Sequence, residues 1–280
     1  MLVAMRKIVP VILYCLLIMI NVCLIAGLKG GNATYPAFDE ACMLQVIRNQ
    51  NVAEEDRARI AQYAKETEYT FAQYLYAYYY SGSLEQTELE ACFNYLRERY
   101  PAVMERQVGY LDAIWSDGVY FPIPAARVDA KKEISFMDSW MQSRSYGGDR
   151  GHEGCDIMAA CNERGVYPVV SISDGVIEQM GWLEQGGYRI GVRGASGAYF
   201  YYAHLSDYAE NLCVGDSVMA GELLAFMGDT GYSKVEGTTG NFDVHLHFGI
   251  YLNDETGKEF SVNSYALLRY LEQRKLVYDF

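Results

Sequence analysis

The sequence predicts an α+β protein in three parts: an N-terminal transmembrane helix, a small helical segment and a mostly antiparallel β domain. Three observations support this fold class. An uncharged and almost wholly apolar run covers residues 8–28, residues 39–116 have helical periodicity, and short strand-like runs separated by glycines follow residue 121. We therefore expect a membrane anchor at 1–30, a helical extracytoplasmic segment at 31–120 and the β domain at 121–280.

The apolar run from Ile8 to Leu28 contains 21 residues, enough at about 1.5 Å per residue to cross a hydrocarbon core of about 30 Å. Arg6 and Lys7 precede it, which favours a cytoplasmic N-terminus. A cleaved signal peptide is the competing interpretation, although its apolar region usually has only about 7–15 residues. We expect a single-pass protein of the cell membrane with its later parts outside the cytoplasm.

The composition is that of a folded protein, with 51% hydrophobic and 21% charged residues. The formal net charge is −13. Such a chain offers no basic surface to neutralise phosphates, which argues against a nucleic-acid partner.

The helical segment is expected to contain one helix within 51–80, a second over 84–99 and a short third that ends near Trp115. Ser83 is expected to be the N-cap of the second helix, with Gln86 as its capping-box partner. Tyrosines are frequent near residues 74–80, and core packing explains them better than a ligand-binding face. A spacer or a module that docks a protein partner is the expected role of this segment.

The β domain is expected to begin near residue 121, where helical periodicity ends. A terminal helix is expected over residues 261–274. The expected strands cover residues 169–173, 175–180, 188–193, 198–203, 223–227 and 245–251. Many short strands at similar spacing favour a compact antiparallel sheet or a barrel-like domain.

The four histidines of the chain all lie in the β domain, in three short contexts. His152 stands four residues before Asp156, His204 ends an aromatic run, and His245 and His247 alternate. Catalytic zinc usually takes three protein ligands from His, Asp, Glu or Cys and keeps one position open. A strand would place His152 and Asp156 on one face, and likewise His245 and His247, since side chains alternate. Two adjacent strands would then form a three-ligand site with one imidazole to spare.

Each histidine alone has an ordinary structural explanation, because a lone buried histidine is more often a hydrogen-bonded core residue than a ligand. The coincidence of all four in one glycine-rich β domain favours a metal site. His204 and the spare imidazole would then supply acid–base chemistry near neutral pH.

These motifs resemble the lysostaphin-like zinc metallopeptidases, the M23 family. The resemblance covers residues 121–255 and rests on the sequences around His152 and Asp156, on Tyr-Ala-His-Leu at 202–205, on Gly-Asp-Thr-Gly-Tyr-Ser at 228–233 and on His-Leu-His-Phe at 245–248.

The resemblance implies that His152, Asp156 and His247 bind Zn²⁺ and that His204 and His245 are the catalytic histidines. It also implies a zinc metalloendopeptidase that cleaves peptide bonds in the stem or cross-bridge of bacterial peptidoglycan. The alternative is a catalytically silent member of the family that acts as a scaffold or an activator of another cell-wall hydrolase. All five site residues are present, which favours the enzyme.

Overall fold

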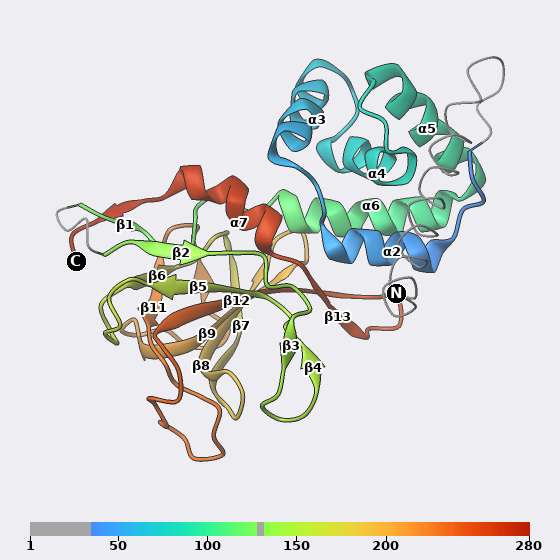
Figure 1. The fold of residues 1–280 in the computed structure, drawn as a ribbon. Coiled ribbons are helices and arrows are strands. Elements are labelled where there is room, and N and C mark those ends of the chain that lie inside the picture. Colours follow the sequence, from blue (N-terminus) through green and yellow to red (C-terminus); the bar gives the residue numbers. More distant parts are fainter. Residues whose placement is uncertain (1–34, 128–131) are drawn as a thin grey trace, which may run out of the picture. The chain divides into compact units, whose positions relative to one another are not determined.

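The structure of the protein is a computed structural model, and it describes residues 35–127 and 132–280. Residues 39–280 form one compact unit, and the following description concerns that unit. Figure 1 labels its elements. The first helices of the unit are α2 (Glu40–Asn49), α3 (Glu54–Glu66), α4 (Phe71–Ser81), α5 (Gln86–Arg99) and α6 (Pro101–Trp115).

The helix expected within residues 51–80 is two helices, α3 and α4. The break lies at Thr67, which has extended backbone and whose hydroxyl donates to the carbonyl of Tyr63 at 3.0 Å. Thr70 then caps the start of α4, where its side chain and that of Gln73 form a capping box. The hydroxyls of two threonines thus end one helix and start the next.

The capping box expected at Ser83 and Gln86 is wrong. Helix α5 begins two residues later than expected, and its N-cap, Glu85, makes no side-chain capping bond. The Ser83 hydroxyl instead donates to the carboxylate of Glu88 at 2.7 Å. A nearby carboxylate thus engages the hydroxyl that the expected cap required.

Tyrosines of α4 pack inside the helical group. Tyr74 and Tyr76 are fully buried. Their hydroxyls donate to Glu90 at 2.6 Å and to Gln107 at 2.8 Å. The core-packing interpretation therefore holds for these two side chains, since buried hydroxyls need such acceptors.

The strands follow the helices along the chain, and a short helix and a 3₁₀ turn lie near the end. The strands are β1 (Ala125–Ala126), β2 (Ile134–Phe136), β3 (Ser143–Arg144), β4 (Arg150–Gly151), β5 (Cys155–Ala159), β6 (Pro168–Val170), β7 (Gly175–Leu183), β8 (Gly187–Gly194), β9 (Tyr199–Tyr208), β10 (Ser217–Val218), β11 (Leu223–Met227), β12 (His245–Asn253), β13 (Glu259–Val262) and β14 (Val277–Tyr278). The C-terminal helix is α7 (Tyr265–Leu271), and η1 (Glu272–Arg274) follows it.

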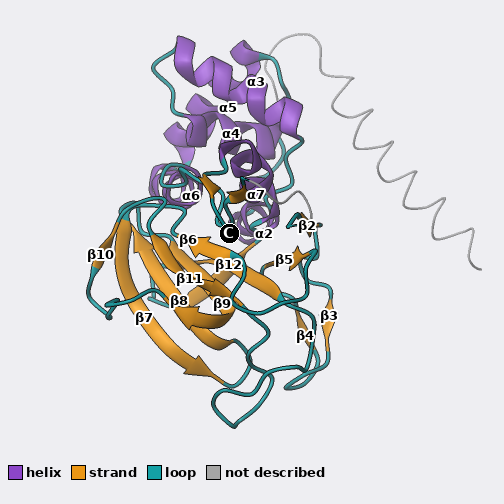
Figure 2. Cartoon of the chain, turned by 90° about the vertical axis from the view of Figure 1, so that its left-hand side faces the viewer, coloured by secondary structure: helices purple, strands orange, loops and turns teal. Residues whose placement is uncertain are grey.

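The main sheet has ten strands in the described part of the chain, and its longest path runs β10-β7-β8-β9-β12-β5-β2. Every strand pair in this sheet is antiparallel. The sheet is strongly twisted and curved (Figure 2). Strand β12 is central, because it pairs with β9, β5 and β13. The expected antiparallel β domain is present.

The six expected strands overlap β6, β7, β8, β9, β11 and β12, whereas β2, β5 and β13 were not expected. Strand β5 has a polar start, and its pairing with β12 and β2 provides the partners that make it a strand. The expected helix over 261–274 is shorter, since its first residues belong to β13 and only Tyr265–Leu271 is α-helical.

The expected transmembrane helix over residues 8–28 lies outside the described residues. Among those that are described, no helix is both long and apolar enough to cross a membrane. Helix α6 is the longest of them, and its 15 residues extend about 22 Å, less than a hydrocarbon core of about 30 Å. The fold class is therefore corrected to a mostly β domain preceded by helices. The expected single-pass location in the cell membrane is corrected on the same finding.

The helical group contacts the sheet region through α2 and α3. The Arg48 guanidinium of α2 donates to the carbonyl of Ser261 in β13 at 3.0 Å. The Arg57 guanidinium of α3 lies 4.4 Å from the ring centre of Tyr270 in α7. The domain boundary near residue 120 stays a prediction. It falls between the end of α6 and the start of β1.

A buried side chain of the central strand, Phe248, provides a test of what stabilises the fold. Phe248 of β12 is fully buried, and its ring centre lies 5.3 Å from that of Tyr202 and 6.4 Å from that of Phe200. We expect Phe248→Ala to lower the free energy of unfolding by about 3–5 kcal/mol. Urea unfolding of the full chain measures this, with Val235→Ala as control, because Val235 is 70% exposed and should change stability by less than about 0.5 kcal/mol.

Candidate metal centre

Two adjacent strands and the loop before them hold the metal-ligand candidates. In the antiparallel register of β5 and β12, His247 lies directly opposite Asp156. His245 shares a face of β12 with His247, as alternation requires. His152 was expected on the same strand as Asp156, but His152 lies in the loop between β4 and β5. The loop nevertheless brings its imidazole to the same point.

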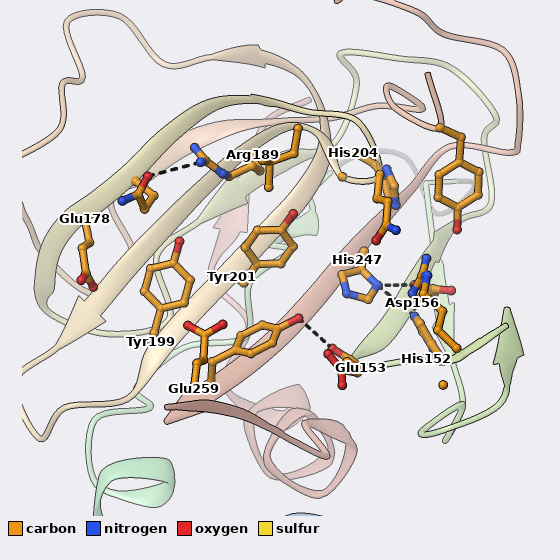
Figure 3. Close-up of a pocket in the computed structure, with 18 of the residues that line it drawn as sticks. His152, Glu153, Asp156, Glu178, Arg189, Tyr199, Tyr201, His204, His247 and Glu259 are labelled. Carbon is orange, nitrogen blue, oxygen red and sulfur yellow. Dashed lines mark hydrogen bonds and ion pairs between the residues drawn. The ribbon is translucent and has the colours of Figure 1, made fainter. Parts of the chain in front are cut away.

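Three side-chain atoms from these residues converge. His152 Nε2 lies 2.9 Å from His247 Nδ1 and 3.0 Å from Asp156 Oδ1. His247 Nδ1 is also 3.0 Å from Asp156 Oδ1. Figure 3 shows the three side chains turned toward one another at one end of a groove.

This cluster fits a divalent metal ion such as zinc. It offers two imidazole nitrogens and one carboxylate oxygen, all within 4.8 Å of one another. Atoms bound tetrahedrally to one zinc ion at about 2.0–2.2 Å are about 3.4 Å apart, close to the spacing found here. Three protein donors also leave a fourth position for a water molecule or a substrate.

Neighbouring groups orient two of these ligands. His152 Nδ1 lies 3.0 Å from the hydroxyl and 3.2 Å from the carbonyl of Ser139. Since a carbonyl only accepts, the proton belongs on Nδ1, and the lone pair of Nε2 faces the cluster. The Arg144 guanidinium donates to the outer oxygen of Asp156, Oδ2, at 2.7 Å. The inner oxygen of this carboxylate therefore remains directed to the histidines.

Asp156 is the negative group of the cluster. Burial raises the pKa of Asp156, but the neighbouring side chains of His152 and His247 outweigh burial and hold it well below the usual range. The carboxylate is therefore ionised near neutral pH, as a metal ligand must be.

His204 and His245 lie beside the three ligand candidates. Their ring centres are 4.7 Å apart, and His204 is 6.0 Å from His247 on the same measure. His204 Nδ1 lies 2.8 Å from the carbonyl of Thr230, and His245 Nδ1 lies 2.7 Å from that of Asp243. Both rings are therefore protonated on Nδ1, which leaves each Nε2 able to accept a proton.

His204 is held by an unusual backbone as well as by its neighbours. Its φ is 62°, in the left-handed region that residues with side chains rarely occupy. Burial, together with His245 and His247, keeps the pKa of His204 well below its ordinary value. An uncharged imidazole thus faces the cluster near pH 7.

Aromatic rings from two loops close one side of the site. Tyr232 meets His204 edge to face at 5.7 Å between ring centres, and Phe242 does so at 4.6 Å. Tyr146, from the β3–β4 turn, stacks on Tyr232 at 4.5 Å with an interplanar angle of 6°. These rings restrict water on that side of the histidines.

A groove of about 570 Å³ leads away from the cluster over β8, β9 and β12. His152, Asp156, His204 and His247 line one end, while Tyr199, Tyr201 and Arg189 lie farther along (Figure 3). The arrangement can hold an extended chain across the metal-ligand candidates.

The structure brings together all five residues singled out in the sequence, although their individual roles remain proposals. Sequence reasoning missed the groups that position them. Thr230 and Gly154 lie inside the quoted motifs and could have been noticed there. Arg144 and Ser139 had no sequence signal, because their importance depends only on spatial proximity.

The fold and the cluster define an antiparallel β protein with a candidate divalent-metal centre. The model of Peptidase family M23 matches residues 150–259. The L-Ala–D-Glu endopeptidase of Bacillus subtilis is 34% identical over 213 residues, which is 73% of this chain and 60% of that protein. The glycyl-glycine endopeptidase ALE-1 of Staphylococcus capitis is 41% identical over 122 residues, 41% of this chain and 30% of that protein.

A crystal structure from Ruminococcus gnavus, of a protein named as a glycyl-glycine endopeptidase, lytM, is 44% identical with a TM-score of 0.71. The match covers 84% of this chain and 93% of that one. The chain belongs to peptidase family M23, and the resemblance found in the sequence is confirmed. The matched part of this chain spans less than two thirds of the length of the two curated relatives above.

Gly154 provides a test of the centre. A Cβ at this position would lie 2.7 Å from Nε2 and Cε1 of His247 and 2.7 Å from the carbonyl of Phe248. We expect Gly154→Ala to displace His247 and to weaken Zn²⁺ binding about 10- to 100-fold. Competition with a chromophoric chelator measures the affinity. Gly109→Ala is the matched control, since nothing lies within 4 Å of its added Cβ. Equal affinities in the two variants would contradict the expectation.

The ion pair of Arg144 with Asp156 gives a second test. Arg144→Gln should leave Oδ2 without its charged donor, loosen the carboxylate and weaken Zn²⁺ binding about 10-fold. The control is Arg127→Gln, because Arg127 pairs with Asp279 on the surface at 2.8 Å. The same chelator competition applies, and an unchanged affinity in Arg144→Gln would show that the carboxylate is held without it.

Proposed function

We propose that this protein is a zinc metalloendopeptidase that cleaves peptide bonds in the stem or cross-bridge of bacterial peptidoglycan. The observation that carries the proposal is the convergence of His152 Nε2, Asp156 Oδ1 and His247 Nδ1 at the end of an open groove. Two further imidazoles border this point, each with an unprotonated Nε2.

We assign the metal ligands to His152, Asp156 and His247. Two imidazoles and one carboxylate form a donor set that zinc hydrolases use, and zinc is therefore the proposed ion. A bound zinc ion would lower the pKa of a water molecule toward 7 and polarise the carbonyl of the scissile bond.

We assign the acid–base work to His204 and His245. With Nδ1–H of each ring donated to a backbone carbonyl, Nε2 can take a proton from the attacking water and return one to the leaving amine. His245 Nε2 lies 3.8 Å from Asp156 Oδ1, which places it next to the proposed ligands. The tyrosine and phenylalanine rings beside His204 limit competing solvent.

The substrate class rests on family membership and on the groove. The relatives are named for two different bonds, L-Ala–D-Glu and glycyl-glycine, and both names describe cleavage between amino-acid residues. A groove of about 570 Å³ can hold a short extended peptide. A catalytically silent scaffold is the alternative, and no observation in the described residues favours it.

Separate substitutions test metal binding and catalysis. We expect His247→Ala to lose stoichiometric zinc, because it removes a ligand, whereas His204→Ala should keep zinc but cleave about 10²- to 10⁴-fold more slowly. Zinc content is measured by elemental analysis, and cleavage by mass spectrometry of fragments released from purified peptidoglycan.

The wild-type protein provides the decisive comparison. Stoichiometric zinc without release of peptide fragments from walls of stem-linked and glycine-bridged types would contradict the enzyme and support the scaffold. Full activity in His204→Ala would contradict only the role of that histidine.

A further inference from the structure

Arg189 of β8 is a cation without a carboxylate partner in the part of the chain that the structure describes. Its Nη2 donates only to the neutral amide of Gln179, at 3.3 Å. Its Nη1 is buried and has no hydrogen-bond partner among the described residues. A buried guanidinium nitrogen without an acceptor is costly, and such groups call for a ligand or a functional reason.

The other arginines of the groove are engaged. Arg193 pairs with Glu178 at 2.7 Å and lies 5.0 Å from the ring centre of Tyr199. Arg150 donates to the backbone carbonyl of Tyr146 at 3.4 Å. Among the described groove arginines, Arg189 is thus the one with a buried donor that has no acceptor.

Strand register places Arg189 close enough to the metal-ligand candidates to act on the same substrate. Strand β9 lies between β8 and β12, with Ala203 of β9 opposite His247 of β12. Arg189 falls in the segment of β8 that pairs with Tyr202–Leu205 of β9. Two strand spacings amount to about 9.6 Å, and an extended peptide covers this distance in about three residues.

Tyrosines form the floor beside Arg189, and glycines make room for them. A Cβ at Gly191 would lie 1.7 Å from the hydroxyl of Tyr199, and one at Gly186 would lie 2.1 Å from that of Tyr201. Glu153 and Glu259 lie beyond these rings from Arg189 (Figure 3). An anionic ligand is repelled on the side of Glu153 and Glu259 and attracted on the side of Arg189.

We propose that Arg189 forms a subsite that binds a carboxylate of the substrate peptide, within about three residues of the scissile bond. This inference rests on the proposed function and deepens it. A stem peptide with a γ-linked D-glutamate presents a free α-carboxylate, whereas a glycine bridge has no side-chain carboxylate. Arg189 therefore selects acidic stem peptides over neutral bridges.

Three synthetic peptides test the subsite with the zinc-loaded full chain. The first is acetyl-L-alanyl-γ-D-glutamyl-L-lysine amide, with a free glutamate carboxylate. The second has that carboxylate amidated, and the third combines the amidated glutamate with a free C-terminal carboxylate. Steady-state kcat and KM are measured for each peptide, and calorimetry gives the affinity of each for the metal-stripped protein.

The wild-type protein should favour one carboxylate peptide over the fully amidated peptide by about 10- to 100-fold in KM and in affinity, as a charge-assisted hydrogen bond implies. Preference for the first peptide identifies the glutamate carboxylate, and preference for the third identifies the chain terminus. Arg189→Gln should remove the preference. Arg193→Gln, which alters an arginine already paired with Glu178, should keep it.

The outcomes separate this subsite from the proposed function. The subsite is overturned if the wild-type protein has the same KM and affinity for all three peptides, or if neither carboxylate peptide binds. It is also overturned if Arg189→Gln keeps the preference. Cleavage of all three peptides at equal rates would leave the peptidase standing without it. A carboxylate preference in binding with no cleavage would support the subsite and count against the peptidase.

Discussion

The candidate metal centre depends on the register between β5 and β12. Because this antiparallel pair sets His247 opposite Asp156, a carboxylate oxygen and an imidazole nitrogen meet at 3.0 Å. A shift of one residue would turn His247 to the other face of the sheet and dissolve the cluster. The hydrophobic side of β12, which includes Leu246 and Phe248, opposes such a shift, since these side chains would lose their burial. The packing of the core therefore also fixes the geometry of the candidate metal site.

Around this cluster, backbone carbonyls decide where protons lie. Ser139, Thr230 and Asp243 each offer a carbonyl to the Nδ1 of one histidine. The three Nε2 atoms are thereby left as bases, one within the ligand triangle and two beside it. These acceptors come from loops that the sheet holds in place, so the β domain sets which nitrogen of each imidazole carries the proton.

The groove beside the cluster is also formed by side chains that the sheet positions. Tyrosine rings packed over glycines form its floor. Arg189 lies on one side of these rings, and Glu153 and Glu259 lie on the other (Figure 3). The metal centre is formed from residues in the shared motifs, whereas Arg189 lies outside them.

The family, the helical-then-β order and the five candidate residues that the structure brings together could be read from the sequence, because local periodicity and short motifs record these features directly. The sequence misjudged the ends of several elements: a threonine pair divides the helix expected within 51–80, and β13 takes the start of the terminal helix. Arg144 and Arg189 could not be recognised, since nothing local distinguishes them from other surface arginines. The fold alone establishes that Arg144 meets Asp156 and that Arg189 meets no carboxylate among the described residues, because partners distant in the chain become neighbours only when the sheet forms.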